Sequence, residues 1–337
     1  MNKLTKIGAS ALCGSLAAIS AANAGDLTVT GGVDMSWISL DDETTGNPLG
    51  IGSNLTFSGS GELDNGWSVD LSVANTNANA YSNTNVTVGV PGLGDFRISQ
   101  GVSGGGIDRM DDMTPNVWEE AYGTGLGTGI DTVGGASGGA NIEFTPSGTP
   151  DGITARVLWS PNAGGSGSSD KAGSGDTGTV KSSGYDITLE ASSDFTGVEG
   201  LTLYGGFASV EQHNNAAAYS GDRDEVTVGA KYAMGSFTLG YQWSEDDLGR
   251  ATGATQYNND AYGITFNVND DLSIGYNHYE SEQEGNAVTA EASSIQIAYT
   301  MGGASIRLAE ASADNMKYQT GAAYDRDATT ISVSLAF

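Results

Sequence analysis

The feature that most constrains this chain is a two-residue alternation of apolar and polar side chains, which recurs from residue 26 to the C-terminus. Segments of about ten residues alternate in this way, and turn residues such as Asp64-Asn65-Gly66 separate them. A period of two places successive side chains on opposite faces of a β-strand. In the segment 26–39 one face collects the apolar side chains Leu27, Val29, Val33, Met35 and Trp37.

The number of these segments and the lengths of their connections indicate a closed barrel. We count sixteen segments, joined alternately by short turns and longer loops. An even number of antiparallel strands brings the two chain ends together, so that the barrel closes without a free edge. The sequence therefore predicts an all-β fold, a transmembrane antiparallel β-barrel of sixteen strands with a long loop folded into its lumen.

A soluble β-sandwich is the alternative, because its strands would alternate in the same way. Its apolar face would form a core, and it would more often have about seven to nine strands. Three features favour a membrane: a signal-peptide pattern at the start of the chain, the acidic polar face, and aromatic side chains near strand ends, as in the interfacial girdles of membrane barrels. These aromatics, each of which would also suit ordinary strand packing, are Trp37, Trp67, Trp159, Trp243, Tyr232 and Tyr299.

Residues 1–24 have the pattern of a cleaved signal peptide. Lys3 and Lys6 precede a short apolar run, and Ala22-Asn23-Ala24 forms a small-residue cleavage site. We expect the barrel domain to span 25–337 and to lack cysteine, because Cys13 lies inside the signal. The alternatives are a first amphipathic helix of the mature domain and a lipoprotein signal modified at Cys13.

The chain is strongly acidic, with a formal net charge of −28. Removal of residues 1–24 takes away two lysines and no acid, which changes that charge to −30. Such a charge speaks against nucleic acid and anionic surfaces as partners and favours cations. The alternative is an acidic surface that only keeps the protein soluble, as in proteins from salty environments.

The stretch 103–139 is a long connection in which no alternation is evident from the sequence. Loops of this length in a compact domain are most often functional or disordered. Pro115, Val117, Trp118 and Tyr122 could pack on a wall, and we expect the flanking glycines to act as flexible hinges. We predict that the segment narrows the barrel and presents to the lumen the carboxylates of Asp108, Asp111, Asp112, Glu119 and Glu120. The alternative is a solvated acidic loop face.

Four basic residues have the parity of the polar, lumen-facing side of their strands: Arg97, Arg156, Lys231 and Arg307. Opposite the loop acids they would create a transverse field at the narrowest point, since rings of charged side chains are how such pores select ions. The alternative is that each forms a lumen ion pair with no role in transport.

The sequence offers little for catalysis or metal chemistry. Its only histidines, His213 and His278, lack a partnered nucleophile, and no Cys/His cluster is present. The acid pair Asp111-Asp112 could hold Ca²⁺ through carboxylate oxygens, although no calcium-loop spacing surrounds it. We therefore predict that the protein is no enzyme and has no cofactor, with structural Ca²⁺ as the one alternative.

Taken in order, these features resemble a Gram-negative general porin of the alphaproteobacterial type. They are the signal ending at Ala24, the immediate first strand DLTVTGGVDMSW, the acidic loop after the fifth strand, and the terminal TTISVSLAF. The resemblance implies a homotrimer in the outer membrane, with 103–139 as the constriction loop. It also implies that Phe337 ends a signal read by the barrel-assembly machinery. The family's usual cluster of arginines is absent here, which favours a stronger cation preference.

The expected function is passive diffusion of ions and small hydrophilic solutes through a water-filled pore that prefers cations. A substrate-specific channel or surface receptor is a second hypothesis, for which Tyr204, Tyr279 and Trp118 are candidate stacking residues. A structural barrel plugged by its own loops is a third.

Overall fold

The computed structural model describes residues 27–41, 48–76, 83–100, 104–164, 181–212 and 218–336. The expected signal peptide 1–24, Ser103, His213 and Phe337 lie outside the described residues. The described chain forms sixteen strands: β1 (Thr28–Leu40), β2 (Leu49–Glu62), β3 (Ser68–Thr76), β4 (Asn83–Val90), β5 (Gly94–Gln100), β6 (Asn141–Pro146), β7 (Ile153–Ser160), β8 (Lys181–Ala191), β9 (Leu201–Gln212), β10 (Arg223–Met234), β11 (Phe237–Asp247), β12 (Gln256–Asn267), β13 (Leu272–Gln283), β14 (Thr289–Met301), β15 (Ala304–Asp314) and β16 (Arg326–Ala336).

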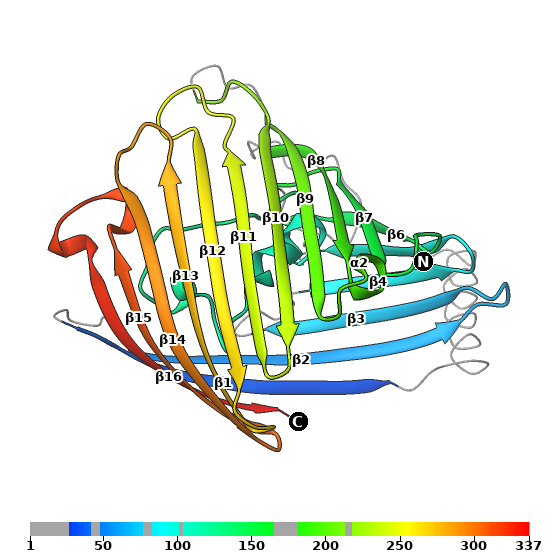
Figure 1. Ribbon diagram of the computed structural model, residues 1–337. Coiled ribbons are helices and arrows are strands. Elements are labelled where there is room, and N and C mark those ends of the chain that lie inside the picture. The colour runs from blue at the N-terminus through cyan, green and yellow to red at the C-terminus, as the bar shows by residue number, and fades with distance from the viewer. Residues whose placement is uncertain are drawn as a thin grey trace, which may run out of the picture.

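These strands form one closed antiparallel barrel in which each pairs with its neighbours in sequence. The barrel closes where β1 pairs with β16, with Met35 opposite Val333 and Trp37 opposite Ile331. Figure 1 shows the strands wrapped around a central space that holds the segment between β5 and β6. The prediction of a closed, sixteen-stranded barrel is confirmed.

Apolar side chains face the outside of the barrel and polar side chains face its interior, the reverse of a soluble protein. Large apolar residues face outward on every side, and Ile51, Val228 and Ile295 are 67%, 51% and 61% exposed. Polar side chains such as Asn277 and Gln296 are fully buried on the inner side. A soluble sandwich would bury its apolar face, and soluble monomers rarely expose large contiguous apolar surfaces. The outer face of the barrel is therefore suited to an apolar environment such as the interior of a bilayer.

The two ends of the barrel differ. Short connections join β10 to β11 and β14 to β15, whereas longer segments join strands at the opposite end. The β8–β9 connection contains a short helix that the sequence did not suggest, α2 (Ser193–Thr196), with the Ser192 hydroxyl accepting the Asp194 N–H. Within the described residues, no helix has the length and apolar character that crossing a membrane requires.

A row of carboxylates crosses the outer face of four adjacent strands, near the end with the longer loops. Register partners join its members in the order Asp260, Glu280, Glu291 and Asp314. The hydroxyls of Tyr241 and Tyr262, both exposed on the outer face, donate to Asp260 and Glu280. Like charges directly opposite one another destabilise a sheet, and charges are costly in hydrocarbon. The row therefore marks where the apolar band of the outer surface ends.

Candidate functional site

The candidate site is the segment between β5 and β6, described from residue 104 and called here the inner loop (104–139). Its first part, the outgoing leg, contains the 3-10 helix η1 (Gly106–Met113), which packs against β7 to β10. The Glu143 carboxylate of β6 accepts the Gly106 N–H at 2.8 Å and the Arg109 guanidinium at 2.5 Å. Figure 1 shows this helix inside the barrel, behind the front strands. The inner loop thus lies inside the barrel from Gly106 onward.

The outgoing leg continues across the inner wall toward β14. Pro115 lies so close to Gly240 of β11 and Gly263 of β12 that a side chain at either glycine would collide with it. Further on, the Gln296 side chain of β14 accepts the Trp118 N–H at 3.1 Å and donates to the Glu119 carbonyl. The expectation that apolar loop residues pack on a wall is met by Pro115, which is buried.

The tip of the inner loop reaches the far side of the barrel. The 3-10 helix η2 (Ala121–Gly123) lies against β13 to β15, and the Tyr122 ring meets the Tyr279 ring edge-on at 4.8 Å. Beyond it, Thr330 and Arg326 of β16 donate to the carbonyls of Thr124 and Leu126. The loop therefore spans the lumen from β6 to β16.

The last part of the inner loop, called here the returning leg (123–139), corrects one reading of the sequence. Its glycines are not free hinges, because residues 123–132 alternate strictly between exposed and buried. The exposed positions are Gly123, Gly125, Gly127, Gly129 and Asp131, and the buried ones are Thr124, Leu126, Thr128, Ile130 and Thr132. A two-residue period was thus present in the loop as well. It was missed because glycine, rather than a polar side chain, occupies most of the exposed positions.

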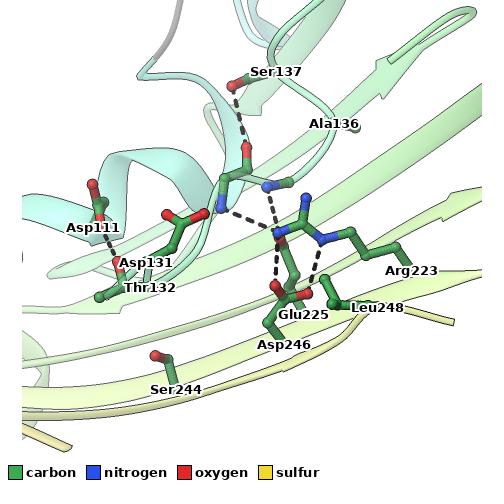
Figure 2. A network of polar contacts seen from close by, with 12 residues as sticks. Asp111, Asp131, Thr132, Ala136, Ser137, Arg223, Glu225, Ser244, Asp246 and Leu248 are labelled. Carbon is green, nitrogen blue, oxygen red and sulfur yellow. Dashed lines mark hydrogen bonds and ion pairs between the residues drawn. The ribbon is translucent and has the colours of Figure 1, made fainter. Parts of the chain in front are cut away.

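The returning leg is fixed by carboxylates of β8 and β10. Glu225 accepts the N–H groups of Gly134 and Gly135, and Asp186 accepts the Ala136 N–H at 3.0 Å. Arg223 Nη2 lies 2.7 Å from a carboxylate oxygen of Glu225 and 2.7 Å from one of Asp246. Figure 2 shows the three side chains gathered beside the returning leg. Arg109 and Glu225 were not among the predicted site residues, because their partners Glu143 and Gly135 lie 34 and 90 positions away along the chain.

The five predicted loop acids fall into two environments. Asp112 is exposed and Glu119 is half-buried, so these two can face the open lumen. Asp108, Asp111 and Glu120 lie against the loop's own backbone and side chains. Tyr122 and Thr132 donate to Asp111, Asn116 donates to Glu120 at 2.7 Å, and the Gly104 N–H donates to Asp108. Asp131, a further exposed loop acid, was not among the predicted set.

Burial changes the protonation of these acids. Desolvation, with the nearby Asp112 charge, raises the pKa of Asp111 to about 7. Desolvation also raises the pKa of Glu120 to about 7, with the neighbouring Glu119 adding to the shift. Desolvation is also the main cause that raises the pKa values of Asp108 and Asp112. The charge of the loop therefore varies with pH near neutrality.

The four predicted basic wall residues do not form one cluster against the loop acids. Arg97 and Arg156 pair with Glu143 and Glu190, and Arg307 lies 2.9 Å from the Asp34 carboxylate. Lys231 approaches the outgoing leg at the Met113 sulfur, 3.7 Å away. In the described parts of the chain, the ion pairs of the three arginines join them to wall carboxylates rather than to the five loop acids.

The inner loop leaves one side of the lumen open. A hollow beside β1, β2 and β16 is lined by polar groups that include Thr30, Asp34, Asn54, Thr56 and Arg307. A second hollow is lined by Ser58, Ser72, Asn85 and the Asp70 carboxylate of β3. Both hollows are therefore lined mostly by hydroxyl and amide side chains.

The candidate stacking residues Tyr204, Tyr279 and Trp118 and the histidine His278 do not form a further site. Tyr279 is buried under Tyr122, and Tyr204 is buried with its hydroxyl bonded to Gln242, so neither can stack against a solute. Trp118 is half-buried in the loop. His278 lies on the outer face beside Glu280. Among the described side chains, no three His, Cys, Asp or Glu residues gather in a metal-binding arrangement.

Known proteins share this architecture. A family model described as Gram-negative porin matches residues 8–306. The fold is similar to that of the anion-selective porin from Comamonas acidovorans, with a TM-score of 0.68 and 14% identity over 93% of this chain and 99% of that chain. It is also similar to Salmonella typhi OmpF in complex with daunomycin, with a TM-score of 0.67 and 11% identity over 93% of this chain and 98% of that one. No curated protein matches the sequence.

Proposed function

The chain belongs to the Gram-negative porin family, and we propose that it forms a cation-preferring, water-filled channel for passive diffusion of ions and small hydrophilic solutes. The observation that carries the proposal is the placement of the inner loop. It lies on the inner wall from β6 to β16 and leaves a polar passage beside β1 to β3. A loop in this position excludes solutes by size without closing the barrel.

The distribution of charge supports the cation preference. The wall arginines Arg97, Arg156 and Arg307 each have a carboxylate partner, which cancels most of their field in the lumen. The acids Asp70, Asp112 and Asp131 take part in none of the ion pairs of the described residues and are exposed. Rings and clusters of acidic side chains favour cations in pores. A related fold carries anion selectivity in the Comamonas protein, so preference must come from side chains rather than from the barrel.

Recording from single channels in planar bilayers tests the proposal. In a KCl gradient, purified protein should show stepwise conductance and a reversal potential of the sign for cation preference. Folded protein that passes no current would contradict the channel and favour the plugged barrel. A reversal potential of the opposite sign would contradict only the selectivity. Concentration-dependent block of the current by one sugar or amino acid would favour a substrate-specific channel instead.

The loop acids supply a mutational test. The fourfold change Asp111→Asn, Asp112→Asn, Glu119→Gln and Glu120→Gln should reduce the cation preference, because it removes negative charge from the inner loop while keeping side-chain size. A matched control replaces the same number of acids on the outer face: Asp260→Asn, Glu280→Gln, Glu291→Gln and Asp314→Asn. Equal reversal potentials for the two variants would mean that the loop acids do not set the selectivity.

We also infer a homotrimer in the outer membrane, reached by export with residues 1–24 as signal and by recognition of Phe337 during barrel assembly. The family likeness supports these steps. The mass of the protein–detergent complex and the N-terminal residue of protein purified from membranes would test them. Calcium at Asp111 and Asp112 stays a prediction, and the channel does not depend on it.

A further inference from the structure

One buried carboxylate contacts both legs of the inner loop. Asp186 of β8 is fully buried. Its Oδ2 accepts the Ile107 N–H of the outgoing leg at 3.1 Å, and its Oδ1 accepts the Ala136 N–H of the returning leg at 3.0 Å. Residues 107 and 136 lie three residues inside the two ends of the inner loop (104–139), so this side chain joins the two legs close to the wall.

The loop backbone is shaped around this carboxylate from both sides. Gly106 and Gly135 have φ values of +56° and +60°, in the left-handed region that favours glycine. A Cβ at either position would collide with the Asp186 carboxylate, and at Gly135 it would also lie 2.6 Å from Ile107 Cγ2. Two glycines with this backbone conformation, one on each leg, therefore form a close-fitting cradle for a single side chain.

Asp186 differs from the other wall carboxylates that bind the loop. Glu143 pairs with Arg97 and Arg109, and Glu225 pairs with Arg223. In the described part of the chain, the hydrogen bonds to Asp186 come from loop backbone N–H groups, and no ion pair includes it. A buried polar group without partners is unfavourable, so the carboxylate and the docked loop depend on each other.

We propose that Asp186 is the positioning residue that holds the two ends of the inner loop against β8 and thereby fixes the cross-section of the passage. This role rests on the proposed channel function. It assigns to Asp186 no contact with the passing solute, because the side chain is fully buried. It predicts that releasing one leg lets the loop visit positions in which the passage is wider.

The test compares Asp186→Asn with Asp70→Asn in single-channel records. Both remove one lumen carboxylate, but Asp70 on β3 lines the open hollow and has no loop contact among its neighbours there. In Asp186→Asn an amide NH₂ would face one of the two backbone N–H groups, which removes one hydrogen bond. We expect the fraction of time spent in substates of higher conductance to rise about tenfold, the effect of losing one such bond.

Gly135→Ala disturbs the same contact from the loop side without changing Asp186 itself. It should give the same substates, because its Cβ would collide with the Asp186 carboxylate and force the returning leg away from it. Limited trypsin digestion supplies a second readout, since release of the outgoing leg exposes the backbone at Arg109. We expect faster cleavage after Arg109 in Asp186→Asn and Gly135→Ala than in Asp70→Asn.

The outcomes separate this inference from the proposed function. Absence of current from the unchanged protein would overturn the channel. If the unchanged protein conducts, substates and cleavage rates of Asp186→Asn or Gly135→Ala that match those of Asp70→Asn would overturn the role of Asp186. If Asp186→Asn fails to fold, as judged by the heat-dependent gel mobility of barrels, the substates and cleavage rate of Gly135→Ala alone decide whether Asp186 has this role.

Discussion

At the scale of single residues, the acids of the inner loop are expected to make selectivity depend on pH. Burial raises the pKa values of Asp111 and Glu120 to about 7. Both side chains are therefore neutral in acid and gain charge as the pH rises through 7. We expect the cation preference to increase between pH 5.5 and pH 8.5.

Reversal potentials measured across this range check the expectation. Asp111→Asn combined with Glu120→Gln should give a flatter profile, and a profile as steep as that of the unchanged protein would contradict the assignment. Stability depends on pH in the opposite direction: it falls, whereas the cation preference rises, as the pH increases. Because the folded pKa values exceed the unfolded ones, the folded state binds more protons between about pH 4 and pH 7. Docking of the loop is therefore favoured at low pH and weakens as the pH rises through 7.

The residues show what sequence alone can and cannot supply. Alternation along the sequence puts Glu143 and Asp186 on the face opposite to the neighbouring Ile142 and Ile187. The structure has both carboxylates on the inner wall. Their partners could not be predicted, because Ile107 and Asp186 are 79 positions apart and no local pattern links them. The acids Asp108, Asp111, Asp112, Glu119 and Glu120 were picked out by composition, which does not distinguish the exposed Asp112 from the hydrogen-bonded Asp111.

At the scale of elements, the fit of the inner loop to β11 and β12 depends on residues without side chains. Gly263 of β12 lies against the Pro115 carbonyl, and Gly240 of β11 lies against the Pro115 ring. Gly263→Val should displace the outgoing leg from the wall toward the open passage. We expect lower single-channel conductance and a loss of roughly 1–3 kcal/mol of stability, typical of overpacking.

The control is Gly59→Val on β2, where nothing lies within 4 Å of an added Cβ. Single-channel conductance and thermal unfolding in detergent would be measured for both variants. Equal conductance in Gly263→Val and the unchanged protein would show that the leg does not border the passage.

The elements themselves were largely predictable, and the loop was not. Alternation located all sixteen strands, because one face of each meets an apolar surround and the other a polar interior. The returning leg follows the same period, but Gly125, Gly127 and Gly129 at its exposed positions gave the appearance of a flexible linker. Its order comes from contacts with β16, β10 and β8, whose residues lie 200, 90 and 50 positions away along the chain.

At the scale of the whole molecule, the barrel and the loop should be separable. Closure depends on the pairing of β1 with β16. Deletion of 326–337 would expose two strand edges, which are costly in a membrane, and should abolish the compact form seen in unheated electrophoresis samples. Deletion of 107–135, with the ends joined, should keep that form and raise the conductance. If the loop deletion also failed to close, the loop would be part of the folding unit.

The outward row Asp260, Glu280, Glu291 and Asp314 has a consequence for how the barrel sits in its lipid. The row limits how far these four adjacent strands can extend into the hydrocarbon of the membrane, because deeper insertion would bring several charges into hydrocarbon together. In a thicker bilayer, the hydrocarbon cannot extend past the row on that side of the barrel. The bilayer must instead become thinner around the barrel, or the barrel must tilt, and both responses depend on the lipid rather than on the solute.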